Sequence, residues 1–369
     1  MSPSSSTSSG QRLLDESGLA SSHEPIDEAL VSTVLERDYL VGGRLERLAT
    51  EKDDTFRVRT GSGDYLVKVA PALEPEMVVH LQTAAMRFLE KAAPELPVQR
   101  VKLTVDGGDH VVVATNHGGP RILRVLDFVD GAVWSRTDPD VAQLAAVGET
   151  LGRVDLALEA FEHPAARREL VWDIRHFHEL AGLVEHTPDS EHRRLAQEVF
   201  RYFGRAIVPR LDDLETQVIH GDYSPHNVVV DPQSDDFVIG VIDFGDTVRS
   251  AVIFDPAVAL ANLLGRTPDQ PWADACTFMA GYDQARPVRD SELSLLPVAA
   301  LARLTLRALI TNWRAELVPD RRDYLLSHAK DDWTNVEQAM AVPPGEVAAQ
   351  LLDGRPGGVR RHGRARRFT

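Results

Sequence analysis

Several features that mark particular classes of protein are scarce in this chain. Cys276 is the only cysteine among 369 residues, so no disulfide can form within the chain, and we expect a reducing, cytoplasmic setting. Basic residues are in deficit, because 40 Lys and Arg face 56 Asp and Glu and give a formal net charge of −16. Contacts to nucleic-acid phosphates need clustered Lys and Arg, so this deficit argues against a nucleic-acid partner.

Long hydrophobic runs are missing as well. The longest apolar stretches, such as Leu295–Ala302, are much shorter than the roughly 20 residues that cross a bilayer. The first ten residues are mostly Ser, Thr and Pro, without the basic and apolar parts of a signal peptide. We therefore expect a soluble protein with no membrane partner.

The composition is that of an ordinary globular protein, with 43% hydrophobic and 26% charged residues. A chain of this length suits two lobes of unequal size. Both ends are polar and rich in small residues, which predicts disorder there. The expected divisions are a disordered leader at 1–30, an N-terminal lobe at 31–129, a C-terminal lobe at 130–353 and a basic disordered tail at 354–369.

Strand patterns dominate the first lobe. Phe56, Val58 and Thr60 alternate with other residues, and a glycine-rich turn separates them from the apolar run 65–69, which indicates a hairpin. A helical stripe follows at 75–93. Further strands are predicted at 98–103, 110–114 and 122–129, the first two of them as a second hairpin. The lobe should be a small antiparallel sheet carrying one helix.

Helical patterns dominate the second lobe. The predicted helices lie at 141–161, 191–214, 256–264, 290–317 and 319–341. One β segment, 217–242, interrupts them. The predicted fold class is therefore α+β: a β-rich first lobe, a connecting strand near residue 126, and a larger, mainly helical second lobe.

The β segment is predicted to contain a buried hairpin. Residues 228–230 and 238–242 are apolar and largely β-branched, and a polar turn separates them. Asn227 enters this hairpin and Asp243 leaves it. Because the two ends of a hairpin lie side by side, the Asn227 and Asp243 side chains should come close together.

A histidine and a second carboxylate precede the hairpin. The order is His220-Gly221-Asp222, four further residues and then Asn227. Two carboxylates and one amide oxygen that converge make a site of hard oxygen ligands, which suits Mg²⁺. Phosphoryl transfer requires such a site, together with a carboxylate that orients or accepts the proton of the acceptor hydroxyl.

The spacing H-x-D-x4-N, a hairpin and then D-F-G resembles the catalytic and metal loops of protein kinases. H-G-D-x4-N followed by I-D-F-G-D is more similar still to the aminoglycoside phosphotransferase and choline kinase superfamily, and within it to the hydroxylysine-kinase-like branch. The resemblance covers roughly residues 38–341. It implies a bilobal protein-kinase-like fold and a small-molecule kinase. In that scheme Asp222 is the catalytic base, Asn227 and Asp243 are the metal ligands, and His220 braces the loop.

The same resemblance assigns the phosphate contacts to the first lobe. No Walker A motif and no G-x-G-x-x-G occurs, but residues 48–58 resemble the glycine-poor phosphate loop of the superfamily. Lys68, on an apolar strand, matches the lysine that kinases place on the α- and β-phosphates. Kinases pair this lysine with a glutamate on the following helix, and here Glu76, His80 and Gln82 all stay open as its partner.

The purine and the acceptor are less defined. The connecting strand offers backbone groups of Asp127, Phe128 and Val129, which leaves ATP and GTP both open as the co-substrate. Arg303 and two further arginines lie at helical spacing in an apolar run, and a buried arginine needs a partner, either an internal carboxylate or one on the substrate. The branch resemblance favours hydroxylated amino acids and amino alcohols as acceptors, with aminoglycosides as a third class.

Two alternatives remain at this level. His220 and Asp222 would also begin a two-histidine, one-carboxylate iron site of a non-haem oxygenase, although the residues that follow are helical rather than stranded. A catalytically inactive kinase-like module that binds a ligand or partner would share the motif. Metal-dependent nucleotide turnover separates it from an active kinase.

Overall fold

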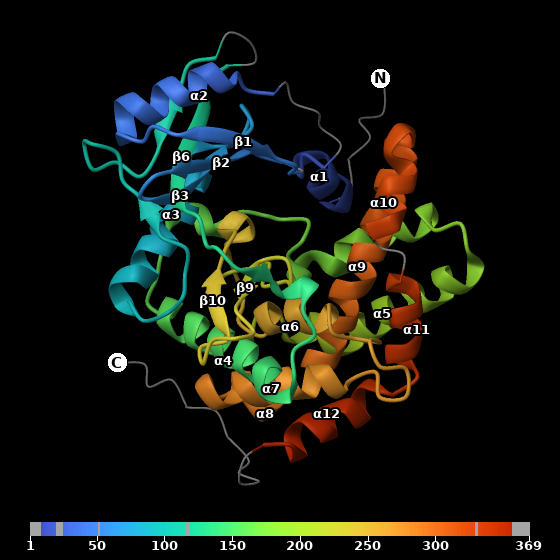
Figure 1. The fold of residues 1–369 in the computed structure, drawn as a ribbon. Coiled ribbons are helices and arrows are strands. Elements are labelled where there is room, and N and C mark those ends of the chain that lie inside the picture. Colours follow the sequence, from blue (N-terminus) through green and yellow to red (C-terminus); the bar gives the residue numbers. More distant parts are fainter. Residues whose placement is uncertain (1–8, 20–24, 51, 116–118, 329–330, 356–369) are drawn as a thin grey trace, which may run out of the picture.

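The computed structural model describes residues 9–19, 25–50, 52–115, 119–328 and 331–355. Two lobes lie one above the other in Figure 1, and the chain passes from the first to the second after strand β6 (Arg121–Asp127). The first lobe is built on an antiparallel sheet and the second is mainly helical. The predicted α+β, bilobal architecture is confirmed.

The sheet of the N-terminal lobe runs in the order β1-β2-β3-β6-β4, and β5 also pairs with β6. The other strands are β1 (Arg44–Leu48), β2 (Asp54–Thr60), β3 (Gly63–Val69), β4 (Val101–Lys102) and β5 (Val111–Val113). The first predicted hairpin is β2 with β3, in which Phe56 lies opposite Val67 and both are fully buried. The helical segments of this lobe are α2 (Glu28–Val34), the π-helical η1 (Leu35–Tyr39) and α3 (Glu76–Ala92).

The second predicted hairpin is wrong. Its turn forms, since the Thr104 N–H donates to the Gly108 carbonyl, but β4 and β5 do not pair with each other. Both pair with β6 instead, Val101 opposite Leu126 and Val111 opposite Leu123. The reason is that β6 is long and almost wholly buried, so its free edge accommodates both short strands.

The C-terminal lobe surrounds two small sheets with helices. Its α-helices are α4 (Val141–Leu158), α5 (Ser190–Ala206), α6 (Phe254–Ala261), α7 (Ala273–Ala285), α8 (Asp290–Leu293), α9 (Leu296–Leu317), α10 (Arg322–His328), α11 (Asp332–Met340) and α12 (Pro344–Asp353). Its 3₁₀ segments are η2 (Trp134–Arg136), η3 (Pro164–Arg167), η4 (Ile174–His186), η5 (Val208–Arg210), η6 (Phe244–Asp246) and η7 (Pro319–Arg321). One sheet joins β7 (Ala132–Val133), β9 (Val228–Val230) and β10 (Val238–Val241), and the other pairs β8 (Thr216–Ile219) with β11 (Val248–Ala251).

Prolines divide or shorten the longest predicted helices. Helix α5 ends before Pro209, and the predicted helix 290–317 divides into α8 and α9, with Pro297 in the first turn of α9. Proline lacks the N–H that a helix interior needs, so it is accommodated in the first turn. The helix predicted at 319–341 is divided into η7, α10 and α11; Pro319 begins η7, but no proline lies between α10 and α11.

Helix α7 was not predicted, and it packs closely on α4. A β-carbon added to Gly148 would lie 1.9 Å from the Phe278 carbonyl oxygen, and one added to Gly281 would lie 1.9 Å from that of Ala145. These distances leave no room for a side chain, so glycine is required on both helices. Helix α4 carries part of the support for the loop 220–227 described below.

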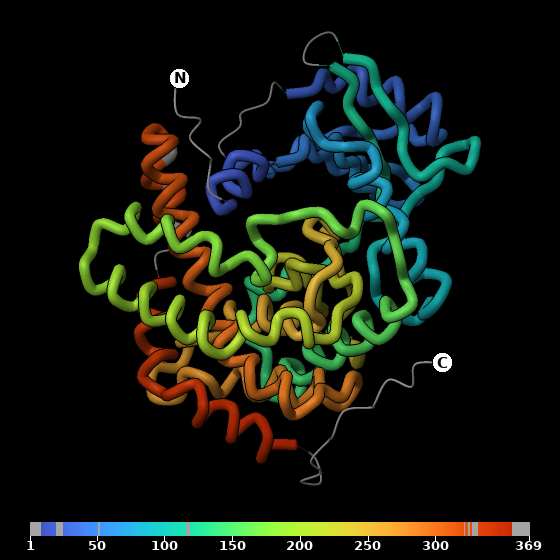
Figure 2. Tube along the Cα trace, turned by 180° about the vertical axis from the view of Figure 1, so that it is seen from behind, coloured from blue at the N-terminus to red at the C-terminus, as the bar shows by residue number. Residues whose placement is uncertain are grey.

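The expected disordered ends are partly ordered. Helix α1 (Ser9–Glu16) lies between the lobes in both ribbon and tube views (Figures 1 and 2), and its Leu13 and Leu14 are buried in the core of the C-terminal lobe. A leader that buries two leucines is not disordered, so the prediction for 1–30 is wrong for this helix. At the other end Arg355 is buried and donates to Asp283 at 3.1 Å, so the expected tail is ordered at its start. Residues 356–369 lie outside the described residues.

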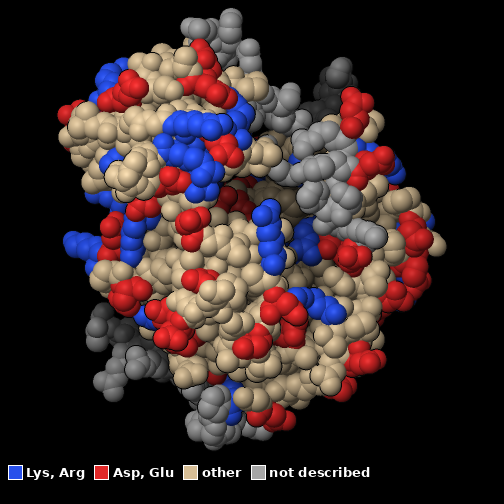
Figure 3. Space-filling view, viewed as in Figure 1, with Lys and Arg blue, Asp and Glu red and all other residues tan. Residues whose placement is uncertain are grey.

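Among the residues that the structure describes, one helical stretch, Asp290–Leu317, is long and apolar enough to span a membrane. It is 83% buried inside the protein over its apolar window, which is the environment of a core helix. On the face seen in Figure 3, acidic side chains are spread over both lobes, and a cluster of Lys and Arg on the N-terminal lobe lies above a hollow between the lobes, with further basic side chains below it.

Candidate active site

The hairpin that carries the motif forms as predicted. Strands β9 and β10 pair antiparallel, with Val241 opposite Val228, and the Ile242 N–H donates to the Asn227 carbonyl at 3.0 Å. All three residues of β9 are buried, so the hairpin is fixed by packing as well as by its ladder. Asn227 and Asp243 therefore flank the same end of the hairpin.

Asp222 is held from two sides. The Asn227 Nδ2 donates to Asp222 Oδ2 at 2.7 Å and to the Asp222 carbonyl at 2.9 Å. The Arg303 Nη2, from α9, donates to Asp222 Oδ1 at 3.3 Å. The Asp222 side chain is 29% exposed, so it keeps access to the space outside the loop.

His220 lies behind this loop and is completely buried. The Asp222 N–H donates to His220 Nδ1 at 3.3 Å, which assigns the ring proton to Nε2, and Nε2 lies 3.1 Å from the Ile242 carbonyl. Both ring nitrogens are thus used within the protein. The ring links the loop to β10.

Two loop residues have left-handed backbone conformations. Gly221 has φ 82°, and an added β-carbon would lie 2.3 Å from the Asp246 carbonyl oxygen, so only glycine fits there. Asp243 has φ 60°, which is uncommon for a residue with a side chain. Such conformations persist where the surrounding structure enforces them, and they cluster at functional sites.

A buried pair of carboxylates anchors the loop from below. Asp255, in the first turn of α6, accepts from the His220 N–H at 2.8 Å and from the Gly221 N–H at 2.9 Å. Asp155 of α4 accepts from the Tyr282 hydroxyl at 2.7 Å. Burial, and then the charge of Asp255, raises the pKa of Asp155 well above its ordinary value. Asp155 therefore holds its proton more tightly in the folded protein than in the unfolded chain.

This arrangement predicts a pH-dependent stability. Because the pKa of Asp155 is raised on folding, its contribution is present at acid pH and is lost as the pH rises through the folded-state pKa. Asp155→Asn mimics the protonated acid, so we expect the variant's melting temperature to fall less than the wild-type value between pH 5 and pH 9. Each 1 kcal/mol by which the variant is stabilised relative to wild type at pH 9 should raise the melting temperature by roughly 1–2 °C.

The matched control is Asp138→Asn, since the Asp138 side chain is fully exposed. It should leave the pH dependence of the melting temperature unchanged. Equal slopes for wild type and Asp155→Asn, measured by thermal unfolding at both pH values, would show that Asp155 is already ionised in the folded protein.

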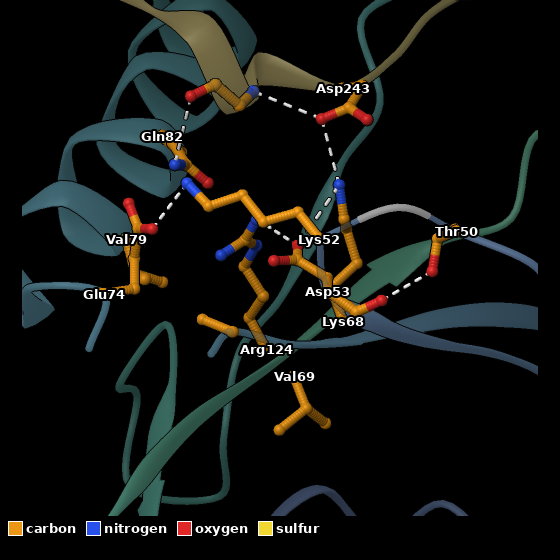
Figure 4. A network of polar contacts seen from close by, with 12 residues as sticks. Thr50, Lys52, Asp53, Lys68, Val69, Glu74, Val79, Gln82, Arg124 and Asp243 are labelled. Atoms are coloured by element: carbon orange, nitrogen blue, oxygen red, sulfur yellow. Dashed lines mark hydrogen bonds and ion pairs between the residues drawn. The ribbon is translucent and has the colours of Figure 1, made fainter. Parts of the chain in front are cut away.

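Lys68 reaches across from the N-terminal lobe to the motif. Its Nζ lies 2.9 Å from Asp243 Oδ1 and 3.5 Å from Asp53 Oδ2, and Figure 4 shows it between the two carboxylates. Arg124, opposite Lys68 in the neighbouring strand, lies 3.4 Å from the same Asp53 oxygen. Burial opposes ionisation of Asp243, but the Lys68 ammonium outweighs it and lowers the pKa of Asp243 to about 2.

The helix residues considered as partners of Lys68 lie in other contacts. Glu76 accepts from His110 at 3.1 Å, His80 lies 2.9 Å from a ring nitrogen of His163, and the Gln82 amide donates to the Gly245 carbonyl at 3.4 Å. In place of the glutamate–lysine pair expected from kinases, Lys68 contacts Asp53, in the segment 48–58 that was predicted to be the phosphate loop. The sequence contained Asp53 within that loop but gave no sign of the pairing, which depends on how the loop folds back.

The connecting strand presents few open backbone groups. The Asp127 N–H donates to the Arg100 carbonyl and the Phe128 N–H to the Asp64 carbonyl, while the Gln99 side chain donates to the Asp127 carbonyl at 2.8 Å. Within the described part of the chain, the backbone of Val129 takes part in no hydrogen bond.

The arginines of α9 have internal partners. Arg303 pairs with Asp222, and its guanidinium lies 4.7 Å above the Trp172 ring. Arg307 binds Asp332 through two bonds of 3.0 and 2.6 Å. Arg314 has an interaction as well. The sequence prediction that a buried arginine needs a partner is confirmed for Arg303, whereas Arg307 is paired but partly exposed.

Arg168 is a further residue of the site that sequence reasoning missed. Its guanidinium donates to the carbonyls of Gly245, at 2.6 Å, and Thr247, at 2.9 Å, and so holds the loop after Asp243. It also lies near Asp246, whose pKa is raised to about 6 by burial and by the charge of Asp222. No sequence pattern marks Arg168, because its contacts are with backbone groups distant in the chain.

The oxygen atoms at this end of the hairpin suit a divalent cation. Because Asn227 gives its amide protons to Asp222, its Oδ1 is turned away from that residue, and the 44% exposure of the Asp243 side chain leaves a carboxylate oxygen accessible. An amide oxygen beside a carboxylate fits Mg²⁺.

In the described ranges no group of three His, Cys, Asp or Glu is arranged to hold a metal. With both His220 nitrogens occupied, the oxygenase alternative is wrong.

Comparison with known proteins agrees with this geometry. Residues 45–291 match the phosphotransferase enzyme family known as APH. The chain is similar to hydroxylysine kinase of Mus musculus, with 23% identity over 86% of this chain and 90% of that protein. It is similar to homoserine kinase of Rhodopseudomonas palustris, with 33% identity over 52% of this chain and 56% of that protein. A microcompartment-associated aminopropanol kinase has a similar structure, with a TM-score of 0.69 and 17% identity over 86% of this chain and 99% of that chain.

Proposed function

This chain belongs to the phosphotransferase enzyme family, and from that premise we propose that it transfers the γ-phosphate of ATP or GTP, with Mg²⁺, to the hydroxyl of an amino acid or amino alcohol. That it is a small-molecule kinase with a hydroxyl acceptor follows from the family and the kinase relatives. The acceptor class rests on those relatives, whose names are hydroxylysine kinase and homoserine kinase. We expect a cytoplasmic enzyme without a nucleic-acid or membrane partner.

One observation carries the proposal. Lys68 of the N-terminal lobe meets Asp243 of the C-terminal lobe at 2.9 Å, beside the hairpin end that Asn227 shares. Kinases need a cation for the phosphates and oxygen ligands for the metal at one place. Mg²⁺ held by Asn227 and Asp243 would neutralise the negative charge of the phosphates.

The other residues of the site would bind the nucleotide on one side of the transferred phosphoryl group and the acceptor on the other. Lys68 would bind the α- and β-phosphates, with Asp53 and Arg124 fixing its position. The open backbone of Val129, next to Asp127 and Phe128, would receive the purine. Asp222 would orient the acceptor hydroxyl and take its proton as the phosphoryl group arrives, while His220 holds the loop in place.

The test is a screen of hydroxyl-bearing amines with ATP and with GTP, followed by release of the nucleoside diphosphate. The acceptors are L-homoserine, L-5-hydroxylysine, 3-aminopropan-1-ol and an aminoglycoside. We expect turnover with a member of the first three, and its complete loss when EDTA removes divalent cations. Binding of nucleotide without turnover of any acceptor would instead support the inactive module.

A further inference from the structure

The Arg303 guanidinium has a hydrogen-bond donor that no group of the described protein accepts from. The residue is 9% exposed, and its Nη1 is buried without a hydrogen-bond partner. A guanidinium carries five N–H donors, and leaving a buried donor unpaired costs free energy. Among the described residues, the Arg303 side chain makes one hydrogen bond, to Asp222 Oδ1. This bond is 3.3 Å long, which exceeds the roughly 2.7–2.9 Å that is usual between charged groups.

Its neighbour on the same helix shows the contrast. Arg307, one turn further along α9, donates twice to Asp332 and also to Asn262. Arg307 is therefore satisfied by side chains of the protein. Arg303, by contrast, lies beside the proposed catalytic carboxylate with a buried terminal nitrogen that has no partner.

The position of Arg303 favours the acceptor over the nucleotide. Asn227, on the metal side, donates to one oxygen of Asp222, and Arg303 donates to the other. Arg303 comes from α9 of the C-terminal lobe, whereas the phosphate-binding Lys68 comes from the N-terminal lobe. Trp172 covers one face of the guanidinium and also lines a pocket with Gly221 and Asp246.

We propose that Arg303 binds the carboxylate of the acceptor, so that the enzyme selects hydroxylated amino acids over amino alcohols. This inference rests on the proposed function and narrows its acceptor class. Arginine suits the task because its planar fork matches a carboxylate. The Trp172 ring, whose centroid lies 4.7 Å from the guanidinium carbon, packs against the fork, and the carboxylate would supply the partner that Nη1 lacks.

The experiment compares each amino acid with the amine that lacks only its carboxylate. The pairs are L-homoserine with 3-aminopropan-1-ol, and L-5-hydroxylysine with 1,5-diaminopentan-2-ol. For the wild type, kcat/KM should be about 10²-fold higher for the amino acid of the preferred pair, since a site built for a charged group rejects an analogue without it. Arg303→Gln should remove most of this ratio, chiefly through the KM of the amino acid.

The comparison uses the ratio of kcat/KM for the amino acid to kcat/KM for its amine. Arg303 also contacts Asp222, so its replacement should lower the turnover of every acceptor, and the ratio cancels that common loss. Arg307→Gln is the matched control and should keep the wild-type ratio. Arg303→Lys, which retains the charge, should restore part of the preference and serves if the glutamine variant does not fold. If neither variant folds, the wild-type kcat/KM ratios alone show whether the enzyme recognises the carboxylate of the acceptor.

Three results would overturn the inference. Equal wild-type kcat/KM within both pairs would mean that the carboxylate is not recognised. A parallel loss for amino acid and amine in Arg303→Gln, with a raised KM for the nucleotide, would place Arg303 on the transferred phosphate. If the wild type turns over none of the four compounds, the proposed function fails, and the inference fails with it.

Discussion

Replacing Asp222 by asparagine should lower kcat by about 10²–10⁴-fold, which is the usual contribution of general acid–base catalysis. The side chain is nearly isosteric, and the Asn227 and Arg303 contacts that hold it come from separate elements. The amide group of the new side chain must face one of these two donors, so we expect a lower melting temperature, with a nucleotide affinity close to wild type. The comparison is kcat for the acceptor found in the screen against nucleotide affinity from equilibrium binding.

Asp231→Asn is the control for this variant. Asp231 lies at the opposite end of the same hairpin, where it accepts from the Gln233 N–H at 2.9 Å. Its replacement should leave kcat unchanged. If kcat of Asp222→Asn also stays near wild type, Asp222 has only an architectural role.

Lys68→Met should lower kcat/KM for the nucleotide on the order of 10²-fold. A hydrogen bond to a charged group contributes about 1.5–3 kcal/mol, and ~1.4 kcal/mol corresponds to a factor of ten. The fold should tolerate the change, because Asp53 retains Arg124 and the Asp243 side chain is partly exposed. Without the ammonium, the pKa of Asp243 should rise from about 2.

The measurements for this variant are steady-state kinetics with varied nucleotide and a thermal unfolding curve. Lys91→Met, at the exposed end of α3, is the control and should behave as wild type in both. Unchanged nucleotide kinetics in Lys68→Met would remove Lys68 from the phosphate site. That result would not contradict the proposed roles of Asn227 and Asp243 as metal ligands.

The motif residues could be placed from the sequence because their geometry is local. His220, Asp222, Asn227 and Asp243 lie on one loop and one hairpin, and apolar β-branched strands fix the pairing that brings the hairpin ends together. The order of strands and helices likewise indicated two lobes. The predicted strand pairing was wrong where a short strand could pair with more than one neighbour. Strands β4 and β5 were predicted to pair with each other, but both pair with β6.

The sequence by itself therefore determined the α+β class, the identity of the candidate site and the family resemblance. Only the tertiary structure decided what each side chain of the site meets. Lys68 and Asp243 are 175 residues apart, and Asp222 and Arg303 are 81 apart. Periodicity and turn chemistry act over a few residues, whereas these contacts depend on how separate lobes and helices pack. The unpaired nitrogen of Arg303 has the same origin, because burial is a property of the assembled core.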